Sequence, residues 1–301
     1  MSLPLVTIMI PTYNQELYIA QAIKSALSQD YPNLEIIVAN DTSTDGTSGV
    51  VQRYISDKRL HYFCNETNIG RVANYRKTLY ERATGEWVLN LDGDDYLCDA
   101  SYISMAMQQL LKNQDAVLAF AEVTVFDEAT KQFIPTKVHH TSSVLNGSDL
   151  FFAVAEKRRF IHHLTCLYHK ATAQQIDFYR LPVISSDWES IFRLLLHGTA
   201  VYNNQTVAVW RKHAANASTL TDKNTIFKNL TFVKSVYRYA QQKGLPSMRL
   251  LRWRILLLDE LLRFYLLPFY KKNKFSFLNL YLRGLYRYPI NMLYLLRRFK
   301  P

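Results

Sequence analysis

The sequence predicts an α/β fold in which a mostly parallel sheet is flanked by helices and followed by an amphipathic helical extension. Over the first 120 residues, short apolar runs alternate with helical patterns, and polar turn-forming residues follow three of the runs. From about residue 225 the chain is instead rich in Leu, Tyr, Phe and basic residues at helical spacing. Strand and helix alternation of this kind implies right-handed crossovers between parallel strands.

Four strands are predicted in the first 120 residues from runs of apolar, often β-branched residues. They cover residues 5–10, 34–39, 60–63 and 87–91. Three helices are predicted between them, at residues 16–29, 44–56 and 71–82. In the first of these, Leu17, Ala20 and Ile23 show the spacing of an apolar helix face.

The pattern becomes less regular after the fourth strand. A further strand is predicted at residues 117–126, followed by weak order until about residue 185. A helix at residues 188–196 and a strand at residues 200–210 come next. A chain of 301 residues without an internal repeat is expected to form one large domain, with the helical end as an appendage.

The positive charge of the chain is concentrated at one end. Residues 225–301 hold 16 Lys and Arg against two acidic residues, whereas the rest holds 20 basic and 23 acidic residues. Nucleic-acid binding through the basic end would leave the acidic motifs of the main domain unexplained. We therefore expect no nucleic-acid partner.

The cysteines and the N-terminal residues indicate the cellular compartment of the protein. Cys64, Cys98 and Cys166 are odd in number and far apart, so neither a disulfide framework nor a zinc site is expected. The N-terminal residues lack the basic region of a signal peptide. Both features indicate a cytoplasmic protein.

Three carboxylates follow the fourth predicted strand. Asp92, Asp94 and Asp95 lie where ligands of open α/β sheets bind, and Asp92 and Asp94 would point the same way from an extended segment. Crowded carboxylates favour a hard divalent cation, Mg²⁺ or Mn²⁺, that bridges them to a diphosphate. The alternative is an Asp-Gly turn with a solvated helix cap at Asp94 or Asp95. Their spacing alone does not decide between the two.

The ends of the first two strands favour the ligand site. The first strand is followed by Pro11, Thr12, Tyr13 and Asn14, and the second by the polar residues 40–46. Convergence of three polar loops at one sheet edge predicts a binding cleft more readily than three unrelated turns do.

These stretches resemble glycosyltransferase family 2, whose members have the nucleotide-binding α/β architecture called GT-A. The matching segments are VTIMIPTYN at residues 6–14, SALSQ at 25–29, DTSTDG at 41–46, NIG at 68–70 and GEWVLNLDGDD at 85–95. The resemblance covers roughly residues 4–215. It implies a catalytic domain of residues 1–220, with a donor-binding half of about residues 1–98 and an acceptor-side half of about residues 99–220.

The resemblance assigns roles around a nucleotide. Tyr13 would pack on the base and Asp41 would accept a hydrogen bond from it, which suits uracil. Asp92 would contact the ribose, and Asp94 would ligate the metal. Arg71 lies close to a family position that contacts the nucleotide.

Pro11, Thr12 and Asn14 complete the expected nucleotide-binding loop. The sequence departs from the family at Asn40, where Asp is usual. This change removes one negative charge but leaves Asp41 in place, so donor binding is expected to survive.

The resemblance also identifies a catalytic base. Asp187 matches the Asp of a Glu-Asp pair in the family, while Ser186 replaces the Glu. A partly desolvated carboxylate near a diphosphate could take the acceptor's proton. The alternative is a helix N-cap, and the two roles are compatible. Glu189 is the fallback base.

A segment after the last predicted strand would close over the donor. Arg211 or Lys212 would neutralise phosphate oxygens, and His213 would bind metal or phosphate. A lone surface His is more often structurally neutral. Four other histidines receive no role beyond lining the acceptor side; they are His139, His140, His162 and His163.

The helical region of residues 221–301 is predicted to associate with a membrane surface. Basic residues recur at helical spacing among Leu, Tyr and Phe, and no apolar run reaches the ~18 residues of a spanning helix. The alternative is that these helices pack on the catalytic domain or on a second subunit of a homo-oligomer.

Together these features predict a metal-dependent inverting glycosyltransferase. It would move a sugar from a nucleotide diphosphate, with UDP preferred, to an acceptor hydroxyl of a lipid-linked or surface glycan precursor. The enzyme would lie at the cytoplasmic face of the membrane. The alternative is a catalytically impaired nucleotide-sugar-binding or scaffold protein, because Asn40 and Ser186 replace acidic residues.

Overall fold

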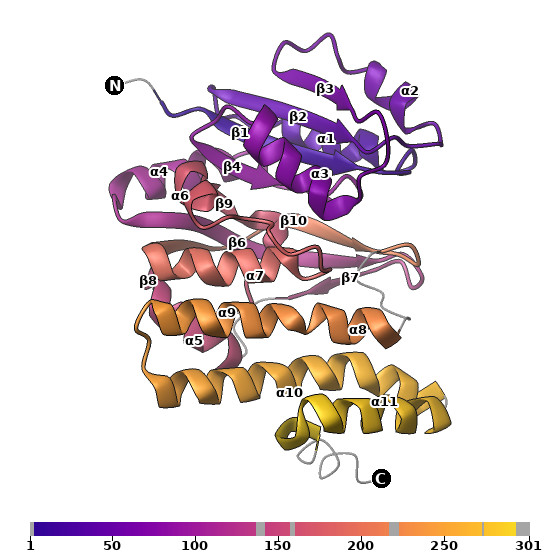
Figure 1. The fold of residues 1–301 in the computed structure, drawn as a ribbon. Helices are drawn as coiled ribbons and strands as arrows, with labels where there is room; N and C mark the ends of the chain where they lie inside the picture. Colours follow the sequence, from indigo (N-terminus) through magenta and orange to yellow (C-terminus); the bar gives the residue numbers. More distant parts are fainter. Residues whose placement is uncertain (1–2, 137–141, 157–159, 217–222, 273, 293–301) are drawn as a thin grey trace.

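One mixed sheet organises the residues described by the computed structural model, which are 3–136, 142–156, 160–216, 223–272 and 274–292. Its strand order is β3-β2-β1-β4-β9-β6-β10-β5, with β7 added beside β6 and β8 beside β10. Figure 1 shows the sheet and its flanking helices in the upper part of the molecule, with the C-terminal helices stacked below.

The first half of the sheet is parallel, as predicted. It consists of β1 (Val6–Thr12), β2 (Leu34–Asn40), β3 (Leu60–Cys64) and β4 (Trp87–Asn90). β1 pairs with β2 from Val6 opposite Leu34 to Thr12 opposite Asn40, so both strands end at the same edge. Every residue of β1 is buried because the strand lies between β2 and β4 and is covered on both faces.

The first two connecting helices are shorter than predicted, and in both the first predicted residues form turns. Before helix α1 (Ile19–Leu27), the Gln15 carbonyl accepts hydrogen bonds from the amides of Tyr18 and Ile19, so residues 15–18 form a turn. Before α2 (Thr47–Gln52), the Asp45 carboxylate accepts from the amide and hydroxyl of Thr47, an arrangement that competes with helix. Helix α3 (Arg71–Lys77) continues as a π-helical turn, η1 (Thr78–Arg82), so the predicted span of 71–82 is confirmed.

The second half of the sheet mixes directions. The long strands β6 (Ala116–Asp127) and β10 (Thr199–Lys212) are parallel, while β9 (Leu167–His169) runs antiparallel to both β4 and β6 and joins the two halves. β5 (Tyr96–Leu97) and β8 (Val144–Asn146) pair antiparallel with β10, and β7 (Gln132–Pro135) with β6.

The helices of this half lie outside the sheet, and one of them leads directly into the site described below. They are α4 (Tyr102–Lys112), α5 (Gly147–Glu156), α6 (Lys170–Gln175) and α7 (Ser186–Leu194), with the short 3₁₀ turns η2 (His163–Thr165) and η3 (Leu195–His197). Between residues 127 and 185, where weak order was predicted, the structure thus contains several elements. Most of them are too short to leave a periodic sequence pattern.

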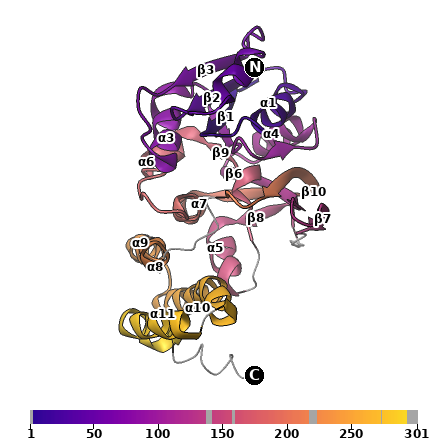
Figure 2. The ribbon, with the colours of Figure 1, turned by 90° about the vertical axis from the view of Figure 1, so that its right-hand side faces the viewer.

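The C-terminal helices pack on the rest of the chain through their apolar side chains. They are α8 (Lys223–Asn229), α9 (Thr231–Gln242), α10 (Ser247–Lys272) and α11 (Lys274–Arg287). Figure 2 shows α8 and α9 below α7 and level with α5, and α10 and α11 below them. The fully buried Trp253 of α10 stacks on Phe151 of α5 with 4.6 Å between ring centroids, and its Nε1 donates to the Phe151 carbonyl. The packing alternative therefore accounts for much of the apolar character of this region.

None of the helices in the described ranges is both long enough and apolar enough to cross a membrane.

Candidate active site

A cleft of about 710 Å³ opens where β1, β2 and β4 end. It brings together most of the residues singled out from the sequence, which are Pro11, Thr12, Tyr13, Asp41, Arg71, Asp92, Asp94 and Asp187. Asn14, Arg211 and His213 are not among its lining residues. The convergence of the three strand-end loops is therefore observed, and the remaining predicted residues surround the cleft.

Asn14 joins the loop after β1 to the loop after β2. Its backbone has a φ of 52°, its amide donates to the Ser43 hydroxyl at 2.9 Å, and its side-chain oxygen accepts from the Thr44 amide at 2.8 Å. Asn is one of the few residues other than glycine that adopts this left-handed conformation readily. The Asn14 side chain thus shapes the wall behind the exposed ring of Tyr13.

Asp41 joins the loop after β2 to the loop after β3. Its carboxylate accepts from the Asn65 side chain at 2.8 Å and from the amides of Ile69 and Gly70 at 2.9 and 2.8 Å. Gly70 has a φ of 88°, which a residue with a side chain would adopt only with strain. Three N–H donors offset the cost of burying the Asp41 carboxylate at the cleft wall.

Asn40, where the resembled family usually has Asp, uses both ends of its amide. The side-chain nitrogen donates to the hydroxyls of Ser48 and Tyr62, and the oxygen accepts from the amide and hydroxyl of Ser43. A carboxylate could not donate the first two bonds. The Asn at this position therefore fits its own surroundings.

The acidic cluster lies at the centre of the cleft. Asp92, Asp94 and Asp95 can each place one carboxylate oxygen so that the three atoms lie within 4.8 Å of one another. Burial raises the pKa of Asp92 and of Asp95, and the Asp94 carboxylate raises both further. A Cβ atom on Gly93 would lie 2.4 Å from the Gln15 side-chain oxygen, so a larger residue would displace the Gln15 side chain from its hydrogen bond with Thr12. The ionised carboxylates of the cluster therefore repel one another, and a bound cation would offset this repulsion.

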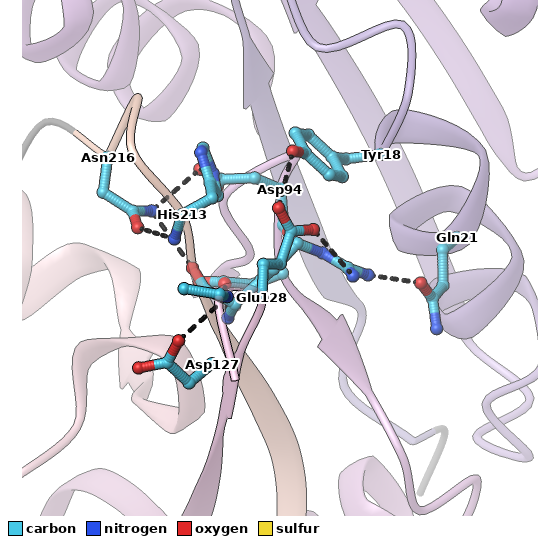
Figure 3. Close-up of polar contacts among 10 residues, drawn as sticks. Tyr18, Gln21, Asp94, Asp127, Glu128, His213 and Asn216 are labelled. Atoms are coloured by element: carbon cyan, nitrogen blue, oxygen red, sulfur yellow. Dashed lines mark hydrogen bonds and ion pairs between the residues drawn. The ribbon is translucent and has the colours of Figure 1, made fainter. Parts of the chain in front are cut away.

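His213 and Asp94 form the most direct candidate for metal ligation. The His213 Nε2 atom lies 3.0 Å from the Asp94 Oδ2 atom, and the side chains are only 8% and 14% exposed (Figure 3). Tyr18 stacks on the His213 ring at 4.8 Å, and Asn216 donates to the same Asp94 oxygen at 3.4 Å. Neighbouring ligands of an octahedral ion with bonds of 2.0–2.1 Å lie about 3 Å apart, so these two atoms have the spacing of adjacent ligands of one cation.

Arg211 does not reach into the cleft. Its amide donates to Asp95 Oδ1 at 2.8 Å, its Nε donates to the Asp94 carbonyl at 3.0 Å, and its guanidinium pairs with Glu128 at 3.5 Å. The neighbouring Lys212 pairs with Asp127 at 2.7 Å. Both cations are engaged by protein carboxylates, and Arg211 holds the acidic loop from behind. A phosphate contact by Arg211, as expected from the sequence, is not what this arrangement shows.

Asp187 enters the cleft from the first turn of α7. The N-cap of this helix is Ser185, so the expected N-cap role of Asp187 is wrong. Asp187 is partly exposed and lines the cleft together with Arg71, whose Nη2 donates to the Ile184 carbonyl at 2.5 Å. The start of a helix is a rigid mount for this carboxylate.

The charge of Arg71 is set by its surroundings in the cleft. Burial alone would lower the pKa of the guanidinium. The nearby Tyr75, Asp92 and Asp187 outweigh this effect and raise the pKa above its usual value. Arg71 therefore stays charged between the acidic cluster and Asp187.

Glu189, the fallback base, is excluded by its position. It is fully buried, accepts from the Ser235 hydroxyl at 2.6 Å, and pairs with Arg193 at 3.5 Å. It does not line the cleft. Burial raises the pKa of Glu189, and its role is to link α7 to α9.

Several residues of the cleft were not identified from the sequence. Tyr75 is buried, and its hydroxyl donates to Asp92 Oδ1 at 2.5 Å. It lies one helical turn after Arg71, which is the only local signal that could have indicated it. The His163 Nε2 atom lies 2.9 Å from the Tyr179 hydroxyl, and the His163 ring lowers the pKa of Asp92 in opposition to burial.

His162 and His163 both line the cleft, and their expected place on its acceptor side stays a prediction. The His162 Nε2 atom lies 3.1 Å from the Thr136 hydroxyl, and burial lowers the pKa of His162 to about 4. His139 and His140 lie outside the described residues.

Curated proteins with similar sequences match part of the chain. The chain is 42% identical over 93 residues to the putative teichuronic acid biosynthesis glycosyltransferase TuaG of Bacillus subtilis, covering 31% of this chain and 36% of that protein. It is 36% identical over 108 residues to the GalNAc(5)-diNAcBac-PP-undecaprenol beta-1,3-glucosyltransferase of Campylobacter jejuni, covering 36% of this chain and 35% of that protein. The alignments therefore span little more than a third of either relative.

Solved structures resemble most of the chain. Residues 1–349 of S. aureus TarS, in complex with UDP-GlcNAc, superpose with a TM-score of 0.71 at 18% identity, covering 86% of this chain and 73% of that one. The mannosyltransferase PcManGT from Pyrobaculum calidifontis, in complex with GDP-Man and Mn²⁺, gives 0.60 at 16% identity, covering 98% and 84%. At these identities the likeness establishes the fold, which is the predicted GT-A arrangement with helices at its C-terminal end.

The family model described as glycosyl transferase family 2 matches residues 7–176, which is more than half of the chain. The matched region contains the three strand-end loops and the acidic cluster. The chain belongs to glycosyltransferase family 2.

Proposed function

We propose that the protein is a metal-dependent inverting glycosyltransferase that moves a sugar from a UDP-sugar to an acceptor hydroxyl. The observation that carries this proposal is the cleft in which Asp41, Asp92, Asp94 and Asp187 meet although they come from three separate parts of the chain. Such a convergence of carboxylates at the carboxyl edge of an α/β sheet suits a nucleotide, a cation and a base.

The first two loops would hold the nucleoside. The exposed ring of Tyr13 offers a face for the base, and Pro11 and Thr12 form the adjoining wall. Asp41 would accept from the base and Asp92 from the ribose, with Asn14 fixing the loop beneath them. UDP is preferred because a carboxylate suits the ring N–H of uracil.

Asp94 and His213 would hold the cation. An imidazole nitrogen beside carboxylates favours Mn²⁺ over Mg²⁺, which takes oxygen ligands almost exclusively. When bound, the ion would supply positive charge that stabilises the departing diphosphate. Asn216 would hold the His213 backbone through its side-chain oxygen, and Tyr18 would keep the His213 ring in place.

Asp187 would act as the base. It would hold the acceptor hydroxyl, take its proton as the oxygen attacks the anomeric carbon, and so invert that carbon in one displacement. Arg71 lies between this carboxylate and Asp92, where it would offset charge on the diphosphate. The cleft walls of Ile161, Leu164 and Trp188 would exclude water from the reacting groups.

The protein would act on a glycan precursor at the cytoplasmic face of a membrane. Residues 1–220 would form the catalytic domain, with donor and acceptor halves meeting near residue 98, and residues 221–301 would contact the membrane or a second subunit. Three free cysteines, two of them exposed, fit a reducing compartment. The C. jejuni relative is named for an undecaprenol-linked substrate, which supports an acceptor of this kind.

A panel of nucleotide sugars tested for thermal stabilisation, with Mn²⁺ or with a chelator, would test the proposal. The correct donor at ~100-fold its dissociation constant should stabilise the protein by about 2.7 kcal/mol with Mn²⁺ and by much less without it. Slow donor hydrolysis that is lost in Asp187→Asn would identify an enzyme. Donor binding with no hydrolysis or transfer would instead favour the catalytically impaired scaffold.

A further inference from the structure

We propose that the cleft contains an apolar arm that holds the hydrocarbon chain of a phosphate-linked lipid acceptor, an inference that rests on the proposed function. We define the apolar arm by six side chains that line the cleft on the side of the C-terminal helices. They are Phe160, Trp188, Phe232, Leu257, Leu261 and Phe264.

The apolar arm is continuous with the carboxylates of the active site, since both line a single cleft. Asp187 and Trp188 are consecutive in α7, so the arm begins directly beside the proposed base. Phe160 meets Trp188 edge-on, with 6.1 Å between ring centroids. An acceptor whose hydroxyl reaches Asp187 would therefore have its remaining part directed along the arm.

The walls of the arm provide few hydrogen-bond partners for a sugar chain. The hydroxyls of Ser185 and Tyr265 lie in these walls, and both accept from the Asn229 side-chain nitrogen, at 3.0 and 2.8 Å. The Glu260 carboxylate, also in the wall, lies 3.9 Å from Arg263. A glycan would leave its hydroxyls without partners along these aromatic and aliphatic walls, whereas a hydrocarbon chain would not.

The surface around the arm suits an anionic lipid. Phe264 is 65% exposed at one end of the arm, although its aromatic ring would be better buried. On α11, which packs on α10, Leu278, Leu282 and Tyr286 recur every fourth residue and are 50%, 57% and 91% exposed. The sequence of residues 225–301, whose described part builds this layer, carries a net charge of +14. An apolar stripe within a basic surface matches a chain that ends in phosphate and is drawn from a membrane.

Quenching of tryptophan fluorescence can test the apolar arm directly. The probe is n-dodecyl phosphate brominated on the carbons next to its phosphate, compared with n-butyl phosphate brominated at the same carbons, both below the concentration at which micelles form. We expect saturable quenching by the longer probe, which is absent in Trp188→Phe. Each buried methylene should tighten binding about fourfold, so the butyl probe should bind at least 100-fold more weakly.

Variants within and outside the arm make the test specific. Phe264→Ser and Leu261→Ser together should weaken dodecyl phosphate binding at least tenfold. Both side chains are at least partly exposed, so the fold should tolerate them. Met248→Ser is the matched control, because Met248 lies on the same helix, is 79% exposed and does not line the cleft. It should bind the probe as the native protein does.

Two outcomes would overturn the proposal. One is equal quenching of the native protein and of the double variant. The other is absence of quenching together with a concentration-dependent dimer that the double variant abolishes, which would assign the arm to a second copy of the chain. Thermal stabilisation by UDP and Mn²⁺ is measured on the native protein and on the same variants. If the native protein is not stabilised, the result counts against the proposed function and not against the arm.

Discussion

The Nε2 atom of His213 lies 3.0 Å from the Oδ2 atom of Asp94, although 119 residues separate the two in the chain. The contact connects the end of β10 to the loop after β4, and therefore connects the two halves of the sheet. If the two side chains form only a hydrogen bond, the His213 Nε2 atom must carry a proton. A bound cation could take the place of that proton. The geometry leads to the first prediction.

We predict that His213→Ala weakens Mn²⁺ binding roughly 100-fold, because it removes one of two close ligands. The Mn²⁺ concentration that gives half-maximal UDP-dependent stabilisation should rise accordingly. Asp94→Asn should have at least as large an effect. His61→Ala is the control, since His61 is exposed on β3 and lies outside the cleft. Identical Mn²⁺ titrations for His213→Ala and the native protein would exclude His213 as a ligand.

We predict that Asp187→Asn lowers the transfer or donor-hydrolysis rate by about 10²- to 10⁴-fold while UDP binding stays within about twofold. The amide keeps the size of the carboxylate but cannot take the acceptor's proton. Glu189→Gln provides the comparison on the same helix, because Glu189 is buried away from the cleft. It should reduce stability, through its contacts with Ser235 and Arg193, more than it reduces the rate per folded molecule. Equal rate losses in both variants would argue against Asp187 as the base.

We predict that Tyr75→Phe raises the KM for the donor about tenfold with little change in kcat. Its hydroxyl donates to Asp92 at 2.5 Å, and a bond to a charged group contributes about 1.5 kcal/mol or more. Losing it would free Asp92 from the orientation in which it meets the ribose. Steady-state kinetics over a range of donor concentrations would measure the effect, and a change confined to kcat would contradict it.

The donor side of the site could be predicted from the sequence because its residues lie in short contiguous motifs. Asp41, Asp92 and Asp94 each follow a strand that the sequence pattern shows clearly, and parallel strands bring their carboxyl ends to one edge. Asp187 was identified by its resemblance to the family and also lines the cleft.

The other parts of the site depend on packing that no local pattern records. Arg211 is two residues from His213, yet its guanidinium pairs with Glu128, which lies just beyond the end of β6, and so turns away from the cleft. The aromatic side chains Trp188 and Phe264 belong to α7 and α10, and only the folded chain places them in one wall. The apolar residues of the C-terminal helices suggested a membrane, but many of them serve the core, as the burial of Trp253 shows.

We predict opposite effects on stability for two serines one turn apart on α7. The Ser186 hydroxyl is buried and has no hydrogen-bond partner within the described part of the chain, so Ser186→Ala should be neutral or stabilising by up to about 1 kcal/mol. The Ser190 hydroxyl donates to the Ser186 carbonyl at 2.7 Å and accepts from the Tyr179 amide at 2.9 Å. Ser190→Ala should therefore cost about 1–3 kcal/mol. Urea denaturation of both variants would compare them, and equal destabilisation would contradict the assignment.

The last prediction concerns pH and His162. The Thr136 hydroxyl donates its one hydrogen to the Val123 carbonyl at 2.8 Å, so it must accept from the His162 Nε2–H at 3.1 Å. Burial lowers the pKa of His162 to about 4, against about 6.5 in the unfolded chain, so the ring is neutral in the folded state at pH 7.

Between pH 4 and 6.5 the unfolded state binds more protons than the folded state, so the free energy of unfolding must rise with pH across this window. The contribution of His162 is fully present above pH 6.5 and lost as the pH falls towards 4, to a limit of about 3 kcal/mol. His162→Gln keeps a side-chain N–H for Thr136 but does not titrate. Urea denaturation between pH 4.5 and 7.5 should give a shallower rise for this variant than for the native protein. The exposed His61 serves as control, because His61→Gln should leave the slope unchanged, and an unchanged slope in His162→Gln would show that the ring is protonated in the folded state.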